Sequence, residues 1–124
     1  MKIKILLFIS FFVTGFAISC NAQYEDTLIV AFWNLQNLFD TKDNPAKEDE
    51  SFLPNGEMQW TEDRLDKKMF NLSRVIRMMN DGNGPDLLGV CEVENQAVLE
   101  EMVKKYLSDL DYKVAYLESP DNRG

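Results

Sequence analysis

Two short apolar runs, each of which ends at a polar side chain, constrain the fold of this chain most strongly. Residues 28–33 lead into Asn34, and residues 87–91 lead into Glu92. Runs of this length between polar segments are typical of buried β-strands. Because ligands of layered α/β folds collect beyond the strand ends, we expect Asn34 and Glu92 to converge on one site.

A carboxylate and an amide at one site favour a hard cation that prefers oxygen ligands. The sequence contains no histidine, and oxygen donors without imidazole suit Mg²⁺, with Mn²⁺ or Ca²⁺ as related choices. Each residue also has a plain structural explanation. Glu92 alone is typical of a solvated charge at a strand end, and Asn34 alone is typical of a turn.

The first residues have the layout of a secretory signal peptide. Residues 1–22 begin with two lysines, continue as an apolar stretch over residues 5–18 and end in small or polar side chains. A membrane anchor is the alternative, but the stretch is short for a span of about 20 residues. Cleavage before Cys20 would leave a lipid-anchored protein, and cleavage after Ala22 would release a soluble one. We expect an exported protein that is periplasmic, extracellular or lipid-anchored at a bacterial envelope.

The charge balance is acidic, with 21 acidic and 13 basic side chains and a net charge of −8. This balance argues against broad, non-specific binding of nucleic acid through a basic surface. It leaves a phosphate substrate open, because a bound cation inverts the local field. Cys91 has no histidine to activate it and is expected to be a small buried side chain.

The segments between and after the two runs predict helices and one more strand. Residues 41–57 are polar and lack apolar periodicity, which indicates a long surface loop. Thr61 is expected to cap a helix over about residues 62–79, and Asn95 a second helix. Residues 112–117 alternate apolar and polar side chains, as a third strand would.

Apolar side chains at helical spacing define the inner faces of these two helices. They are Leu65, Met69, Leu72, Val75, Ile76 and Met79 in the first helix, and Val98, Leu99, Met102, Val103 and Leu107 in the second. The order strand, loop, helix, strand, helix, strand predicts an α/β layered fold. So few elements leave a sheet face or edge uncovered, which suggests the first part of a larger domain.

Three ordered motifs resemble a known superfamily. They are residues 32–40 (FWNLQNLFD), 85–95 (PDLLGVCEVEN) and 119–124 (SPDNRG). Together they resemble the amino-terminal half of the endonuclease/exonuclease/phosphatase superfamily, and most closely its secreted bacterial members. The resemblance implies a partial four-layered α/β sandwich of the deoxyribonuclease type, formed by residues 23–124.

The resemblance also implies a reaction and roles for particular residues. Asn34 and Glu92 would be catalytic and would bind the metal. Arg123, whose guanidinium suits a two-pronged contact with phosphate, and Asn37 are the candidates for binding the substrate phosphate. The reaction would be hydrolysis of a phosphodiester or phosphomonoester by in-line attack of water. The substrate would be a nucleic acid, a phospholipid or a small phosphate ester. The superfamily's histidine–aspartate pair lies in a carboxy-terminal half that this sequence lacks, so we expect the chain alone to be inactive.

Two other functions are compatible with parts of the sequence. A non-catalytic binding module, exported or tethered through Cys20, could use residues 41–57 to meet a partner. A calcium-binding domain could use the acidic side chains of this region, but their spacing fits no EF-hand loop. These side chains are Asp40, Asp43, Glu48 and Asp49. The sequence sets no oligomeric state.

Overall fold

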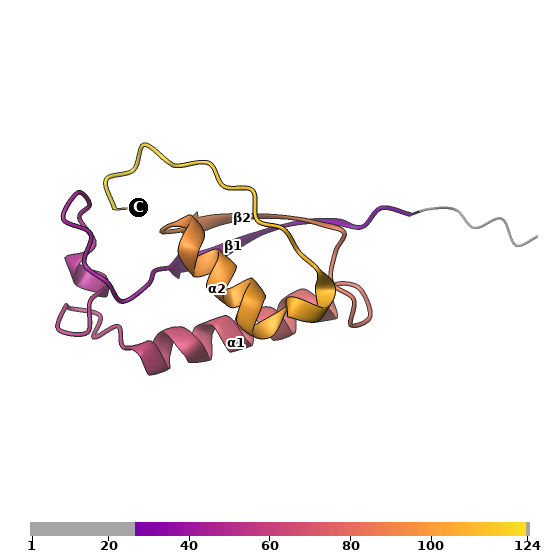
Figure 1. The fold of residues 1–124 in the computed structure, drawn as a ribbon, viewed down its shortest axis with the longest axis horizontal. Helices are drawn as coiled ribbons and strands as arrows, with labels where there is room; N and C mark the ends of the chain where they lie inside the picture. Colours follow the sequence, from indigo (N-terminus) through magenta and orange to yellow (C-terminus); the bar gives the residue numbers. More distant parts are fainter. Residues whose placement is uncertain (1–26, 124) are drawn as a thin grey trace, which may run out of the picture.

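The computed structural model describes residues 27–123, in which two parallel strands lie beside two helices (Figure 1). This arrangement confirms the predicted partial α/β fold. The expected export signal and Cys20 lie outside the described residues. The elements in chain order are β1 (Val30–Leu38), η1 (Glu50–Phe52), α1 (Glu62–Met78), β2 (Leu87–Val93), α2 (Gln96–Tyr106) and η2 (Ser108–Leu110).

The two strands pair in register, and the described residues cover only one face of their sheet. Val30 pairs with Leu87, and Phe32 pairs with Gly89. Paired residues of parallel strands share a face, so the exposed side chains of Val30, Phe32 and Leu87 form one open apolar face. Phe32 is 74% exposed. The prediction of buried strands is therefore wrong for this face, whereas the expected uncovered sheet face is present in the described chain.

The core lies between the other sheet face and the helices, where Leu35 of β1 meets buried side chains of α1 and α2. Four members of the predicted α1 stripe are buried: Leu65, Met69, Leu72 and Ile76. Val75 is instead 42% exposed. It lies one residue, about 100°, from Ile76, which places it at the margin of the apolar stripe.

Both helices begin at the N-cap residues predicted from the sequence, but only one of the two N-cap side chains makes the expected hydrogen bond. Asn95 Oδ1 accepts a hydrogen bond from the backbone N–H of Val98 at 3.0 Å, so the predicted cap of α2 is confirmed. Thr61 occupies the N-cap position of α1 but makes no side-chain cap bond. The first turn of α1 instead carries Glu62 and Asp63, whose charges favour the positive end of the helix dipole.

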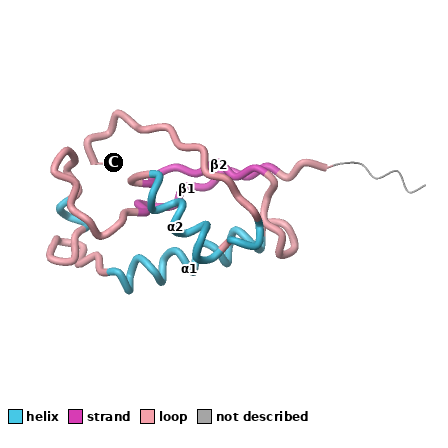
Figure 2. Tube along the Cα trace, viewed as in Figure 1, coloured by secondary structure: helices cyan, strands magenta, loops and turns pink. Residues whose placement is uncertain are grey.

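The predicted third strand does not form. Residues 112–117 belong to no strand (Figure 2). Their side chains nevertheless alternate between half-buried and exposed. Side chains anchor the segment: the Tyr112 hydroxyl donates to the carbonyl of Pro85 at 2.6 Å, and the Tyr116 hydroxyl donates to that of Glu94 at 3.0 Å. The alternation therefore predicted correctly which side chains of residues 112–117 face the protein, but it wrongly predicted backbone hydrogen bonds to a neighbouring strand. The hydroxyl groups of Tyr112 and Tyr116 hold the segment in place instead.

The predicted surface loop, residues 41–57, is folded back on the domain. Its Phe52 ring stacks on Phe39 with centroids 3.9 Å apart. The backbone N–H of Glu48 donates to the carbonyl of Asn122 at 2.8 Å, which ties the loop to the carboxy-terminal segment. Among the described residues, no helix has the length and apolar character needed to span a membrane.

Candidate metal and phosphate site

Asn34 in the middle of β1 and Glu92 near the end of β2 are in direct contact. The expectation that the first strand ends at Asn34 is wrong, because β1 continues to Leu38 after an irregularity in the pairing. Asn34 Nδ2 donates to Glu92 Oε1 at 2.7 Å. The register pairs Asn34 with Cys91, so regular alternation would turn Glu92 toward the helix-covered face. Glu92 instead has a left-handed backbone with φ of 56°. A non-glycine residue in this region costs of order 1–3 kcal/mol, and such residues cluster at functional sites.

The Asn34 amide uses both of its polar atoms within the protein. Its Oδ1 accepts a hydrogen bond from the backbone N–H of Gln36 at 2.7 Å, while its Nδ2 holds Glu92. Within residues 27–123, Glu92 Oε2 has no hydrogen-bond partner. The arrangement therefore fixes one carboxylate oxygen of Glu92 and leaves the other without a hydrogen bond in the described chain. The metal-binding and catalytic roles of both residues stay predictions.

The chain turns sharply after Asn34, and this turn creates a site for a lysine. Gln36 and Asn37 both have left-handed backbones, with φ of 55° and 61°, where the strand ladder is interrupted. Lys68 Nζ of α1 donates to both of their carbonyls, with a distance of 2.9 Å to that of Asn37. Burial lowers the pKa of Lys68, and the nearby Glu92 carboxylate opposes that shift. Sequence analysis did not identify Lys68, because helical spacing gave no sign of this contact with β1.

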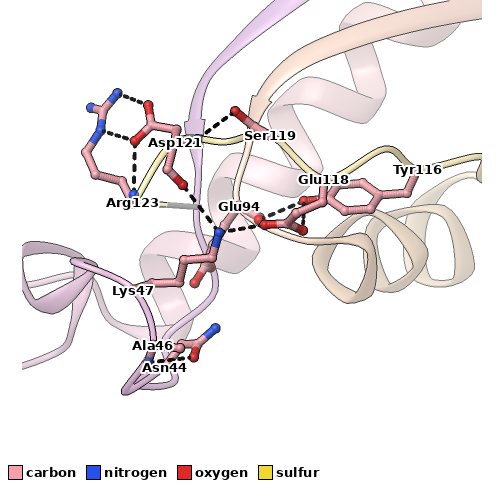
Figure 3. A network of polar contacts seen from close by, with 9 residues as sticks. All are labelled: Asn44, Ala46, Lys47, Glu94, Tyr116, Glu118, Ser119, Asp121 and Arg123. Carbon is pink, nitrogen blue, oxygen red and sulfur yellow. Dashed lines mark hydrogen bonds and ion pairs between the residues drawn. The ribbon is translucent and has the colours of Figure 1, made fainter.

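Arg123 and Asn37 face the same cavity as Glu92. This cavity, of about 480 Å³, lies between β2 and residues 115–123. Arg123 is paired with Asp121, through Nε at 3.2 Å and a terminal nitrogen at 2.9 Å (Figure 3). The Arg123 guanidinium lowers the pKa of Asp121 to about 2. The predicted phosphate contact thus lies close to Glu92, but with its guanidinium already bound to a carboxylate.

A clamp from the loop holds this carboxy-terminal segment in place. Lys47 Nζ donates to Glu118 at 2.6 Å and to the carbonyl of Asp121 at 3.3 Å (Figure 3). Tyr116 joins the same network through its bond to the other Glu118 oxygen at 3.0 Å. The contact joins residues more than 70 positions apart, so no local sequence pattern could have indicated it.

A pair of buried acids lies behind the site. Glu94 Oε2 accepts from the backbone N–H of Asp40 at 2.6 Å. Asp49 is buried, and its Oδ1 has no hydrogen-bond partner among the described residues. Burial first, and then the neighbouring charges of Asp40 and Asp49, raise the pKa of Glu94 to about 7. Glu94 therefore points into the protein rather than toward Glu92.

The acidic loop does not assemble the calcium site considered as an alternative. The Asp40 and Asp49 carboxylates accept hydrogen bonds from nearby backbone N–H groups, those of Lys42 and Asn44. Across residues 27–123, no three or more histidine, cysteine or acidic side chains are grouped so that they could hold a metal ion. A cation at the strand ends would thus rely on few ligands from this part of the chain.

A model of the endonuclease/exonuclease/phosphatase family matches residues 29–124, which include Asn34, Asn37, Glu92 and Arg123. The chain belongs to this family. No curated protein and no solved structure matches it. Family membership indicates a hydrolase of the phosphoesterase or nuclease type, with phosphate esters as the general substrates. Members of the endonuclease/exonuclease/phosphatase family typically depend on a divalent metal.

Proposed function

We propose that this endonuclease/exonuclease/phosphatase chain supplies part of the active site of a metal-dependent phosphoesterase, which hydrolyses phosphodiesters or phosphomonoesters. One observation carries the proposal: Asn34 of β1 holds Glu92 of the parallel strand β2, where the regular pairing of the two strands stops, and leaves Glu92 Oε2 without a partner in the described chain. The strained backbone of Glu92 is the second support, because it turns the carboxylate out of the regular strand alternation.

The donor set fits a hard divalent cation. Glu92 Oε2 would hold Mg²⁺, or Mn²⁺ or Ca²⁺, and the Asn34 amide would keep the carboxylate in place. When bound, the cation would polarise a phosphate oxygen and stabilise the charge that develops during hydrolysis. A single carboxylate leaves most of the hydration shell of Mg²⁺ intact, so we expect weak binding.

The other polar groups have roles toward the substrate. Lys68 places a positive charge near Glu92, where it would attract the phosphate. Arg123 would contact the phosphate after releasing Asp121, since its planar guanidinium suits a bidentate contact. The sequence has no histidine to act as a general base. Efficient turnover would therefore need groups beyond those that the described residues present, and the chain alone is expected to show negligible activity.

Replacing Glu92 with glutamine is expected to weaken Mn²⁺ binding by about tenfold or more, because the only free carboxylate oxygen of the pair is lost. Paramagnetic broadening of backbone amide signals during a Mn²⁺ titration measures this. The broadening should centre on Asn34 and Glu92 in the unmodified chain. Glu101→Gln is the matched control, because Glu101 is an exposed carboxylate on α2.

Equal Mn²⁺ affinity of the two variants would contradict the proposed metal site. A second readout is hydrolysis of bis(p-nitrophenyl) phosphate with Mg²⁺. Turnover that disappears in Glu92→Gln would support the site but would show that the expectation of an inactive chain is wrong. We favour this function over a non-catalytic binding module, because residues 41–57 are engaged with the chain's own carboxy-terminal segment.

We also propose that the protein is exported, on the layout of residues 1–22. Expression in a bacterial host followed by intact-mass measurement of the mature protein tests this. A first residue of Gln23 is expected for a soluble product, and a lipid-modified Cys20 is expected for an anchored one. A mature protein that retains Met1 and the apolar stretch would contradict export by signal cleavage.

A further inference from the structure

A second groove, of about 590 Å³, includes Asn34 in its lining and lies between residues 33–36 of β1 and residues 64–75 of α1. Three cationic side chains of α1 line it: Arg64, Lys67 and Lys68. None of the three forms an ion pair within residues 27–123, where the ion pairs use other cations. Three neighbouring cations outside any ion pair of the described residues are notable in a chain with a net charge of −8.

Two of these cations are held in place around one tryptophan ring. Arg64 lies 5.4 Å and Lys68 Nζ lies 5.5 Å from the ring centroid of Trp60. The Arg64 guanidinium also donates to the carbonyls of Met58 and Gln59, the latter at 3.1 Å. Cations that are fixed before the ligand arrives lose less conformational entropy when they bind it.

The third cation and the position of the groove complete the case for an anion site. Lys67 is exposed and has no hydrogen bond or ion pair in the described chain, so its ammonium is available. The groove shares Asn34 with the candidate site, and Lys68 is close enough to Glu92 for their charges to interact. A ligand that reaches Glu92 would therefore also meet these positive charges.

We propose that this groove binds a second phosphate group of the substrate, next to the phosphate that is held at Glu92. Its place beside the reacting phosphate rests on the proposed function. The substrate class is then one with at least two phosphates, either a nucleic acid strand or a small polyphosphorylated molecule. Trp60 is buried and faces the two cations, so the groove recognises phosphate charge rather than stacking on a base.

Tryptophan fluorescence provides a direct test, because the sequence has two tryptophans, Trp33 and Trp60, and both line the groove. Inorganic pyrophosphate is titrated into the full chain at low salt with EDTA present. We expect a saturable fluorescence change whose apparent affinity falls as salt rises. Lys67→Ala should weaken binding about fivefold, while the matched control Lys104→Ala, an exposed lysine on α2, should bind as the unmodified chain does.

The absence of a saturable change, or equal weakening in Lys67→Ala and Lys104→Ala, would overturn the proposal. A short single-stranded oligonucleotide is compared with pyrophosphate as the second arm. Tighter binding of the oligonucleotide would support a nucleic acid strand as the source of the phosphate, and tighter binding of pyrophosphate would support a small polyphosphorylated molecule.

Because EDTA removes metal ions from the pyrophosphate titration, this experiment tests the groove independently of the metal site at Glu92. Glu92→Gln should bind pyrophosphate at least as tightly as the unmodified chain, because the variant removes a negative charge near Lys68. Pyrophosphate binding together with a failed Mn²⁺ experiment would support the groove and overturn only the metal site. Site-specific Mn²⁺ binding without pyrophosphate binding would overturn only the groove.

Discussion

Replacing Glu94 with glutamine is expected to raise the free energy of unfolding at pH 8 by up to about 3 kcal/mol. Burial and the neighbouring Asp40 and Asp49 raise the pKa of Glu94 from 4.5 to about 7. The folded chain therefore keeps a proton on Glu94 up to about pH 7, whereas the unfolded chain loses it near pH 4.5. Stability should decline as pH rises across this interval, and the full cost of ionisation is present above it.

Glutamine can reproduce the protonated state of Glu94. Its amide oxygen can accept from the backbone N–H of Asp40, as Glu94 Oε2 does at 2.6 Å. Its amide nitrogen can donate toward Asp49, whose buried Oδ1 has no hydrogen-bond partner in the described chain. A buried acceptor without a donor costs about 1–3 kcal/mol, so this contact contributes to the expected gain.

Urea unfolding between pH 4.5 and 8, followed by tryptophan fluorescence with EDTA present, measures the effect. The unmodified chain should lose stability with rising pH, and Glu94→Gln should remove that part of the dependence. Glu101→Gln is the control, because its exposed carboxylate should leave the profile unchanged. Identical pH profiles for Glu94→Gln and the unmodified chain would contradict the assignment of the shifted proton to Glu94.

The parts of this fold that the sequence predicted depend on local pattern. Apolar spacing located α1 and α2, and the Asn95 side chain identified the start of α2. The proximity of Asn34 and Glu92 was also predictable, because the polar residues that follow two apolar runs of adjacent parallel strands lie at the same level of the sheet, although β1 does not end at Asn34. Each of these features could be predicted either from residues that are close in the sequence or from one rule of strand geometry.

The features that sequence analysis missed depend on contacts between distant segments. Alternation over residues 112–117 cannot distinguish a hydrogen-bonded strand from an extended segment that tyrosine hydroxyls anchor. Likewise, an apolar run does not reveal that one face of its strand is open, as Phe32 shows. The left-handed backbone of Glu92 and the position of Lys68 depend on how β1, β2 and α1 pack against one another. No short sequence motif predicts this packing.

Replacing Ile76 with alanine is expected to lower the free energy of unfolding by about 3 kcal/mol, because it leaves a cavity in the core. Ile76 is 0% exposed and belongs to the cluster between the sheet and the helices. Small domains have only about 5–15 kcal/mol of stability in total. With one sheet face open in the described chain, we expect this loss to give a substantial unfolded population at 37 °C.

Val75→Ala is the matched control for Ile76→Ala, since it changes the adjacent, half-exposed residue of the same helix. It should cost less than about 1 kcal/mol, because alanine has the higher helix propensity and little buried volume is lost. Ile76→Val should be intermediate, at about 0.5–1.5 kcal/mol, and guards against a variant that does not fold at all. Urea unfolding compares the three. Similar losses for Val75→Ala and Ile76→Ala would mean that α1 packs with a wider face than its exposure pattern indicates, and the orientation of α1 that places Lys68 beside the end of β1 would then be wrong.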